Sequence, residues 1–234
     1  MQNKRTPLKI PSKKHHPKGI TVIYEDQDIL VVTKQCGVLT IATENDRESS
    51  AYYMLTDFVK RGNSKSKNRI FIIHRLDRDT SGLLVFAKNE RAKRFLQDNW
   101  QSFQKKYVAV VEGQLKETEG IISTYLHENS VFKVYSVDDP RKGKLAETAY
   151  RLIQENSNYS LVDIELITGR KNQIRVHFSE MGNPVAGDKA YGAKSNPLQR
   201  LGLHSYSLII DHPTTGEELH FESVIPARFF QVTK

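Results

Sequence analysis

The chain has almost no cysteine: Cys36 is the only one among 234 residues. A disulfide within the chain is therefore impossible, and a protein without disulfides is typical of a reducing compartment. We expect the protein in the cytoplasm. Nothing beside Cys36 in the sequence would obviously lower the pKa of its thiol, so a small buried apolar role is favoured over a catalytic one.

Long apolar segments are also missing. The chain contains no run of about 18 apolar residues, the length that a membrane-spanning helix needs. Residues 1–19 hold six lysines and arginines and three prolines, without the apolar core of a signal peptide. The sequence thus predicts neither a membrane span nor a secretory leader. Residues 1–19 are expected to form a flexible basic arm.

Patterns for phosphate and metal binding are absent as well. The chain has no GxxxxGKS/T and no GxGxxG element, so nucleotide hydrolysis and dinucleotide redox chemistry have no basis in the sequence. The eight histidines are scattered without ligand spacing or cysteine partners. We therefore expect no cofactor and no bound metal.

The composition is that of a globular protein with an excess of positive charge. Hydrophobic residues make up 38% and charged residues 26%, which are ordinary values for one domain or two small ones. Lysine and arginine exceed aspartate and glutamate by 35 to 27, which gives a net charge of +8. This balance suits a polyanionic partner such as a nucleic acid, although moderately basic surfaces also occur without one.

Strands outnumber helices in the pattern of apolar residues. Helical spacing predicts helices over residues 51–60, 90–100 and 172–181. Short apolar or alternating runs predict strands at residues 21–24, 29–33, 70–73, 83–87, 107–111, 161–166 and 207–210. Because the strands do not alternate with helices one for one, we expect an α+β fold with a mixed, mainly antiparallel sheet and flanking helices.

The most informative stretch is residues 73–87, which read IHRLDRDTSGLLVFA. Two apolar runs enclose a polar loop that contains Arg75, Asp77 and Asp79. The pattern predicts a strand, a loop and a strand, and catalytic groups often lie on such loops. The alternative interpretation is a solvated turn in which an aspartate caps its own backbone.

This stretch resembles the central motif of the RluA family of pseudouridine synthases, which isomerise uridine to pseudouridine in RNA. The aspartate of the family's HRLD motif is its nucleophile and falls here on Asp77, whereas Asp79 falls on a variable position. Further resemblances follow in the family's order at residues 23–40, 106–113, 166–192 and 200–226. Gln35 and Cys36 replace the usual Pro-Ala, and Asn172 replaces a histidine common before Gln-Ile-Arg.

The resemblance implies a catalytic domain over residues 20–234, without a separate N-terminal RNA-binding module and with a central RNA-binding cleft. It implies Tyr107 as the active-site tyrosine, which stacks on the target base. An arginine of the third motif would pair with Asp77. Two candidates exist: Arg175, preferred because it lies one turn inside the predicted helix, and Arg170, which suits a phosphate contact better.

Arg75 and His74, which precede Asp77, are candidates for contacts with the RNA. Arg75 would share the side of Asp77 on an extended segment and would hold RNA after the target base is extruded. His74 is either a structural histidine or a phosphate contact. The resemblance implies an RNA substrate, no metal and no cofactor, and we expect a monomer.

Two other functions compete with a pseudouridine synthase. A catalytically silent RNA-binding protein on the same fold is one, although Asp77, Tyr107 and Arg175 are all present. A metal-dependent nuclease that uses Asp77 and Asp79 is the other, but no further carboxylates stand nearby to complete a two-metal site. The sequence does not decide whether the RNA is ribosomal or transfer RNA.

Overall fold

The computed structural model describes residues 8, 16–42 and 48–234. Most of the predicted basic arm lies outside these residues. The chain divides into two compact units, of which the first comprises residues 1–103 and 207–223 and the second comprises residues 104–206 and 224–234. The single catalytic domain predicted over residues 20–234 stays a prediction.

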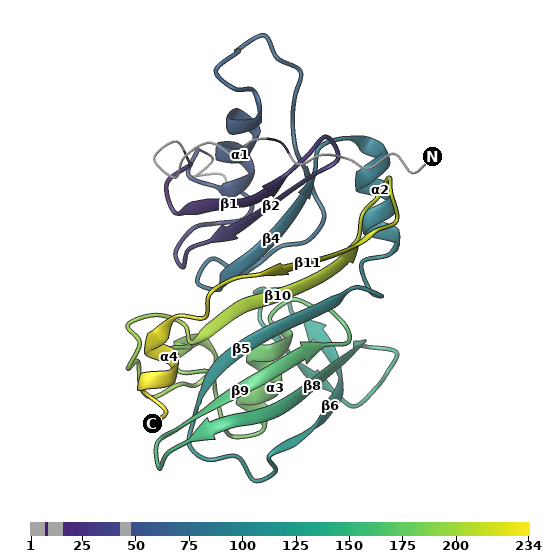
Figure 1. The fold of residues 1–234 in the computed structure, drawn as a ribbon. Helices are drawn as coiled ribbons and strands as arrows, with labels where there is room; N and C mark the ends of the chain where they lie inside the picture. The colour runs from purple at the N-terminus through teal and green to yellow at the C-terminus, as the bar shows by residue number, and fades with distance from the viewer. Residues whose placement is uncertain (1–7, 9–15, 43–47) are drawn as a thin grey trace. The chain divides into compact units, whose positions relative to one another are not determined.

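The first unit is built on short antiparallel strands (Figure 1). β1 (Ile20–Glu25) pairs with β2 (Ile29–Lys34) across a tight turn, and β2 pairs in turn with β4 (Ser81–Ala87). The two-residue strand β3 (Phe71–Ile72) also pairs with β4. All seven residues of β4 are buried, which explains the continuous apolar run over residues 83–87.

Two helices belong to the first unit, and each begins at a residue whose side chain caps it. α1 (Ala51–Val59) starts after Ser50, whose Oγ accepts a hydrogen bond from the Tyr53 amide at 3.3 Å. α2 (Glu90–Asp98) starts after Asn89, whose Oδ1 accepts one from the Ala92 amide at 2.8 Å. Such caps satisfy backbone donors that have no partner inside the helix.

The core of the first unit joins α2 to the strands. Ala92 and Leu96 of α2 pack in one buried cluster with Val31, Val85 and Leu208. Leu208 lies on β10 (Leu203–Asp211), which begins in the second unit and ends in the first, where it pairs with β11 (Glu218–Glu222).

The second unit contains an antiparallel sheet in the order β5-β9-β8-β6-β7. Its strands are β5 (Gln104–Glu112), β6 (Glu119–Glu128), β7 (Val134–Val137), β8 (Lys144–Glu155) and β9 (Tyr159–Leu166). The pairing of β5 with β9 runs from Lys106↔Glu165 to Glu112↔Tyr159. Val108, Val110 and Leu161 on these strands form a core cluster with Phe229.

Three helical segments complete the second unit: α3 (Gln173–Glu180), the 3₁₀ turn η2 (Lys189–Tyr191) and α4 (Ala227–Gln231). α3 begins directly after Asn172, whose backbone is left-handed at φ 55°. It ends before Gly182, which has φ 87°, a conformation that glycine adopts without strain. Val176 of α3 packs with Tyr191, Leu126 and Ala146.

The predicted fold class is confirmed: strands predominate, the register pairs given above are antiparallel, and helices flank them. Predicted elements match observed ones within a few residues, whereas β6, β7, β8, β11 and α4 were not predicted. Within the described part of the chain, no helix is both long and apolar enough to span a membrane.

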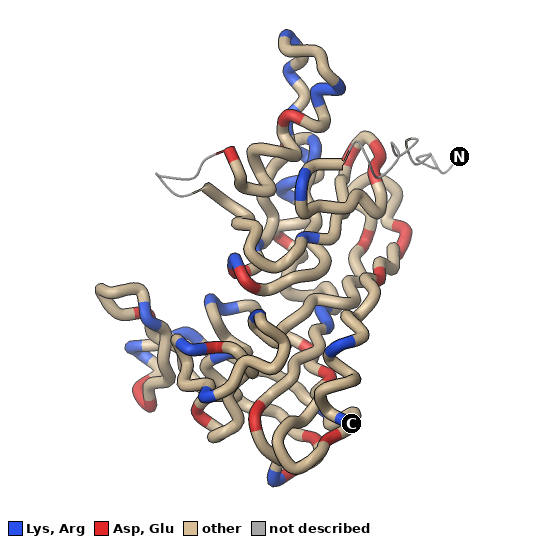
Figure 2. The backbone as a smooth tube through the Cα atoms, turned by 90° about the vertical axis from the view of Figure 1, so that its left-hand side faces the viewer, with Lys and Arg blue, Asp and Glu red and all other residues tan. Residues whose placement is uncertain are grey.

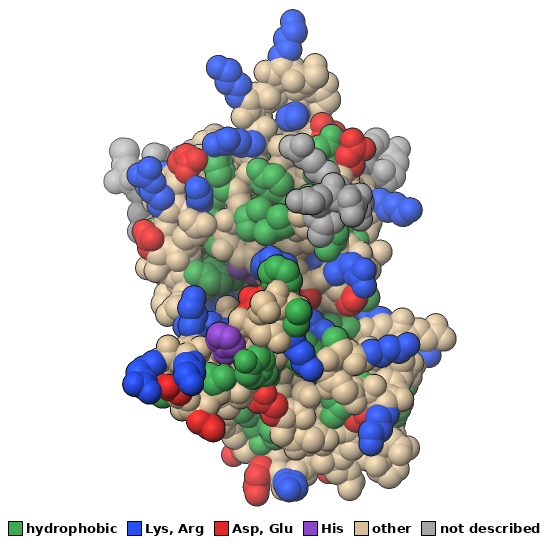
Figure 3. Space-filling model, turned by 180° about the vertical axis from the view of Figure 1, so that it is seen from behind, with side chains coloured by type: hydrophobic (Ala, Val, Ile, Leu, Met, Phe, Trp, Pro, Cys, Tyr) green, Lys and Arg blue, Asp and Glu red, His purple; other side chains and the backbone are tan. Residues whose placement is uncertain are grey.

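Lysine and arginine positions are spread along the chain, and several of them lie in the connection that follows α1 (Figure 2). Lysine and arginine side chains also stand on the surface that is seen from behind (Figure 3).

Candidate active site

Asp77 lies half-buried in the loop between β3 and β4. Hydrogen bonds from other segments hold the backbone of this loop both before and after Asp77. On one side, the hydroxyl of Thr40 accepts a hydrogen bond from the Leu76 amide at 3.2 Å and donates one to the Leu76 carbonyl at 2.7 Å. Thr40 and Leu76 are both buried, so these bonds are shielded from water. The backbone directly before Asp77 is thereby fixed.

The other side is held by a buried lysine. Lys34 is only 1% exposed, and its Nζ donates to the carbonyls of Arg78, Val38 and Gln35 at 2.9, 2.7 and 3.1 Å. The amide of Gly37 donates to the same Arg78 carbonyl at 2.9 Å. A buried charge of this kind is tolerated only when hydrogen bonds replace its water. Lys34 therefore ties the backbone after Asp77 to the end of β2.

The two aspartates of the loop have different surroundings. The carboxylate of Asp79 forms a two-pronged ion pair with the guanidinium of its neighbour Arg78, at 3.1 and 3.2 Å. Both side chains are substantially exposed. Arg75 is exposed as well, as an RNA contact requires. Asp79 is thus neutralised locally by its neighbour, whereas Asp77 occupies the position that resembles the family's nucleophile.

His74 has the contacts of a structural histidine. Its Nε2 accepts a hydrogen bond from the Val85 amide at 3.1 Å, and its ring stacks on Trp100 at 4.2 Å between centroids. These contacts fix the ring at the edge of β4. They account for His74 without RNA, and a phosphate contact by His74 stays a prediction.

Tyr107 lies on β5 in the second unit and is 8% exposed. Lys105 precedes it by two residues, so both side chains leave the strand on the same face. Lys105 is buried too, and burial lowers the pKa of its ammonium from 10.5 to about 8, opposed by nearby Glu165. Sequence reasoning missed Lys105, because its burial depends on how β5 is covered.

Arg175 is held in a defined position by the side chain of Asp188. Its Nε and Nη2 donate to the two carboxylate oxygens at 2.6 and 2.8 Å. The Arg175 side chain is 16% exposed and that of Asp188 is 2% exposed. The guanidinium also lies over the ring of Tyr191, 4.8 Å from its centroid. A two-pronged contact of this kind fixes the plane of the guanidinium.

Asn172 completes the setting of Arg175. Its Oδ1 accepts a hydrogen bond from Nη1 of Arg175 at 3.0 Å, and its amide nitrogen donates to the hydroxyl of Tyr191 at 2.9 Å. Asparagine tolerates the left-handed backbone that this position has. Asn172, which stands where the resembled family commonly has histidine, thus contacts both Arg175 and Tyr191.

Arg170 lies in the loop before α3 and is held differently. Its Nε donates to the carbonyl of Leu145 at 2.9 Å, and its amide donates to Oε1 of Gln173 at 2.9 Å. Gln173 is buried and also donates to the Glu147 carbonyl at 2.9 Å. Arg170 is half-buried.

The predicted site residues divide between the two units. His74, Arg75 and Asp77 share one loop of the first unit, whereas Tyr107, Arg170 and Arg175 belong to the second. Sequence reasoning missed Lys34, Thr40 and Asp188. Lys34 gave a signal, because it is a charged residue at the end of an otherwise apolar strand, but nothing local distinguishes Thr40.

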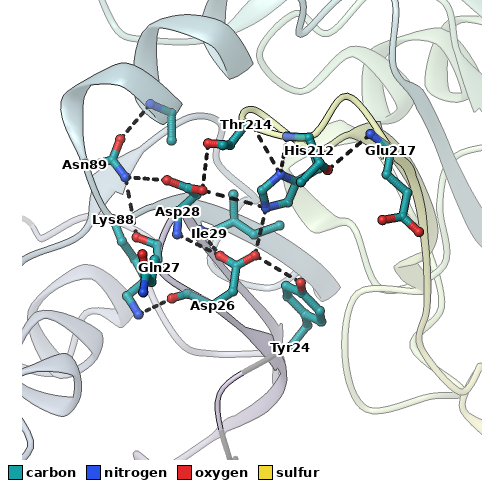
Figure 4. Close-up of polar contacts among 12 residues, drawn as sticks. Tyr24, Asp26, Gln27, Asp28, Ile29, Lys88, Asn89, His212, Thr214 and Glu217 are labelled. Carbon is teal, nitrogen blue, oxygen red and sulfur yellow. Dashed lines mark hydrogen bonds and ion pairs between the residues drawn. The ribbon is translucent and has the colours of Figure 1, made fainter. Parts of the chain in front are cut away.

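One cluster in the described part of the chain has a composition that suits a metal ion. Ligand atoms of Asp26, Asp28 and His212 lie within 4.8 Å of one another, and all three residues are buried (Figure 4). Two of them flank the turn between β1 and β2, and His212 follows β10. The hydrogen bonds of the cluster indicate whether its ligand atoms are available to a metal ion.

Those hydrogen bonds use the atoms that a metal would need. Nδ1 of His212 accepts from the amides of Thr214 and Thr215 at 3.2 and 3.1 Å, so the ring proton is on Nε2, which lies 2.8 Å from Asp26. The other oxygen of Asp26 accepts from the amides of Asp28 and Ile29 at 2.7 and 2.8 Å. The cluster therefore cross-links two turns of the first unit.

Comparison with known proteins agrees with the motifs and the fold. The family model of RNA pseudouridylate synthase matches residues 28–180. The uncharacterized RNA pseudouridine synthase YlyB of Bacillus subtilis is 34% identical over 90% of this chain and 70% of its own length. A relative from Aquifex aeolicus, also an uncharacterized RNA pseudouridine synthase, is 36% identical over 91% of this chain and 72% of its own.

Another relative has a more specific name. The ribosomal large subunit pseudouridine synthase D of Borreliella burgdorferi is 35% identical over 90% of this chain and 66% of its own length. Among solved structures, human RNA pseudouridylate synthase domain containing 4 has a TM-score of 0.74 at 22% identity, with 89% of this chain and 90% of that chain covered. The likeness to that structure concerns the fold.

The chain belongs to the RNA pseudouridylate synthase family. It is therefore an RNA-modifying isomerase, and the predicted enzyme class is confirmed.

Proposed function

We propose that this protein converts specific uridines of structured ribosomal or transfer RNA to pseudouridine, with Asp77 as the nucleophile. The observation that carries the proposal is the rigid support of the Asp77 loop, which Thr40 holds before the aspartate and Lys34 after it. A nucleophile must be held in position while the base turns, and fixed neighbours provide this.

The reaction breaks the bond between C1′ of the ribose and N1 of the base, and rejoins the base through C5. The carboxylate of Asp77 attacks either the sugar or the base, or stabilises positive charge that develops on the sugar. The hydrogen on C5 must leave and N1 must regain one, so a proton moves within the site. Tyr107 stacks on the base and takes part in this transfer.

Arg175 is proposed to pair with the carboxylate of Asp77, because a guanidinium binds a carboxylate through charge-assisted hydrogen bonds. Asp188 and Asn172 hold the guanidinium in place, so that Arg175 needs no reorganisation when the substrate binds. Arg75 and Arg170 are proposed to contact the RNA, and Arg75 lies on the same loop as Asp77. No residue in this scheme requires a metal or a cofactor, and we propose that the enzyme acts as a monomer in the cytoplasm.

The experiment maps pseudouridines by carbodiimide labelling and primer extension in cells with and without the gene. Ribosomal RNA is tested first, since one relative is named for the ribosomal large subunit. Asp77→Asn should fail to restore the missing modification, because it is nearly isosteric and removes only the ionised carboxylate. Asp79→Asn, its matched control, should restore most of it.

Either of two outcomes would reject the assignment: equal loss in both variants, or full activity of Asp77→Asn. If no modification depends on the gene although the protein binds RNA, the silent RNA-binding protein becomes the correct interpretation. A nuclease would lose its activity in EDTA, whereas modification by this protein should survive it.

A further inference from the structure

The connection between α1 and β3 is the most basic stretch in the described part of the chain. Residues 60–69 read KRGNSKSKNR, with five lysines and arginines and no acidic residue. We call these ten residues the basic loop. It follows α1 in the first unit, where Figure 2 shows the backbone with closely spaced lysines and arginines.

Within the described part of the chain, the ion pairs of the basic loop lie near its two ends. Arg61 pairs with Glu25, and Arg69 pairs with Glu90 at 3.3 Å. Lys65 and Lys67 stand between these arginines and are exposed. Their positive charges repel one another, and no acidic residue within the loop relieves this repulsion. A polyanion would relieve it.

The basic loop also has a defined backbone conformation. Side-chain oxygens of Asn63 and Ser66 accept hydrogen bonds from the amides of Lys65 and Asn68 at 3.0 and 3.2 Å. The side-chain amide of Asn68 donates to the carbonyl of Val59, at the end of α1, at 3.3 Å. The loop thus presents its lysines from a backbone that is already ordered, which reduces the entropy lost on binding.

We propose that the basic loop binds the phosphate backbone of RNA, with Lys65 and Lys67 as its main contacts. This inference rests on the proposed function in so far as RNA is the substrate. Lysine ammonium groups on a surface contact phosphates as point charges and do not read bases. The loop therefore adds affinity for any RNA sequence, and the loop that carries Asp77 selects the uridine.

The test measures the affinity of the full-length protein for a single-stranded RNA of 20 nucleotides as a function of salt concentration. The double variant Lys65→Gln/Lys67→Gln should make the slope of log affinity against log salt shallower by about 1.4, or about 0.7 for each phosphate that the protein no longer neutralises. At 0.1 M salt, its affinity should fall by roughly 25-fold, since each neutralised phosphate contributes about 0.7 log units for a tenfold dilution from 1 M.

Two further double variants separate phosphate binding from other effects. Lys65→Arg/Lys67→Arg keeps both charges and should retain the wild-type slope. Lys116→Gln/Lys234→Gln removes the same net charge at exposed positions elsewhere, beside Glu117 and at the C-terminus. It should leave the slope within error of wild type. Circular dichroism establishes that all variants are folded.

Two results would overturn the proposal: a wild-type slope in the loop variant, which is the result expected if the loop binds an acidic protein instead, or an equal change in the Lys116/Lys234 control. The proposed function fails separately. If the wild-type protein modifies no uridine but the loop variant shows the shallower slope, the RNA contact stands while the enzymatic assignment falls. If the wild-type protein modifies RNA while the loop variant keeps the wild-type slope, the enzymatic assignment stands and the RNA contact of the basic loop falls.

Discussion

Nζ of Lys34 donates a hydrogen bond to the carbonyl oxygen of Arg78 at 2.9 Å, across 44 residues of sequence. Arg78 directly follows Asp77, so a buried charge at the end of β2 controls the backbone of the loop that carries the proposed nucleophile. Thr40 makes a comparable link to Leu76 on the other side. Variants of Lys34 and Thr40 can therefore test the support of the loop without changing a residue that takes part in the proposed reaction.

Thr40→Val should lower turnover at least tenfold while RNA affinity changes little. Valine has the shape of threonine but lacks the hydroxyl, so both hydrogen bonds to Leu76 disappear and the loop gains freedom. The unfolding free energy should fall by roughly 1–3 kcal/mol, the usual effect of leaving buried backbone groups without partners. Single-turnover kinetics and urea unfolding measure the two effects. Thr40→Ser keeps the hydroxyl and should retain most activity.

Lys34→Met should have a similar effect through the other side of the loop. The Arg78, Val38 and Gln35 carbonyls would lose their donor, and the unfolding free energy should drop by about 1–3 kcal/mol. Lys116→Met, at an exposed position, serves as the control and should change it by less than about 0.5 kcal/mol. A Lys34→Met protein with wild-type turnover would show that the Asp77 loop does not need this anchor.

Tyr107→Phe should reduce turnover more than RNA affinity. The ring that stacks on the base is kept, and only the hydroxyl proposed to move a proton is removed. Tyr107→Ala should impair both, because it removes the ring as well. Turnover and affinity are measured on one RNA that contains the mapped uridine. Unchanged turnover in Tyr107→Phe would leave this residue as a stacking platform only.

Asp188→Asn should lower turnover in the same way as Arg175→Ala, but by a smaller factor. The asparagine keeps the shape of Asp188 but loses the charge that pairs with the guanidinium, so Arg175 is positioned less firmly. Arg170→Ala should instead weaken RNA binding with turnover of bound RNA preserved. Comparison of kcat and KM across the three variants tests this. A pattern in which Arg170→Ala abolishes turnover and Arg175→Ala does not would exchange the two roles.

Buried histidines should make the protein unstable in acid. Burial lowers the pKa of His177 from 6.5 to about 4, partly opposed by Glu180, and its ring nitrogens lie 2.9 and 3.0 Å from the hydroxyls of Thr148 and Thr124. Between pH 6.5 and about pH 4, the histidine is protonated in the unfolded chain but not in the folded one, so the unfolded chain binds more protons. The unfolding free energy should therefore fall as pH decreases from 6.5 to 4.

Urea unfolding across this pH range measures the loss. His177→Gln should remove up to about 3 kcal/mol of the pH-dependent part. His204, whose pKa burial also lowers to about 4, should account for part of the remainder. A His177→Gln protein with the full acid sensitivity of wild type would contradict the prediction.

EDTA should leave both the melting temperature and the activity unchanged. The cluster of Asp26, Asp28 and His212 uses its ligand atoms for hydrogen bonds, and a metal would have to displace the ring proton of His212. His212→Ala should lower the unfolding free energy by about 2–4 kcal/mol, because it leaves the buried carboxylate of Asp26 with fewer donors. Stabilisation by added Zn²⁺ or Mn²⁺, abolished in His212→Ala, would show that the cluster binds metal.

The sequence by itself determined the family, the fold class and the most regular elements. The HRLD stretch and the motifs around it depend on residue order alone, and comparison with known proteins confirmed the family. α1, α2 and β4 were predicted close to their observed bounds, because local periodicity and capping determine them. β6 and β8 were missed because many of their side chains are exposed, so their apolar pattern is weak.

Only the tertiary structure decided what supports the candidate site. Lys34 contacts Arg78 across 44 residues, Arg175 contacts Asp188 across a turn, and His212 contacts Asp26 across 186 residues. Such contacts depend on which segments the fold brings together, so the partners cannot be predicted from the local sequence. The apolar strand before Lys34 gives a local signal that this lysine is unusual, but its burial and its partners depend on the surroundings that the folded chain provides.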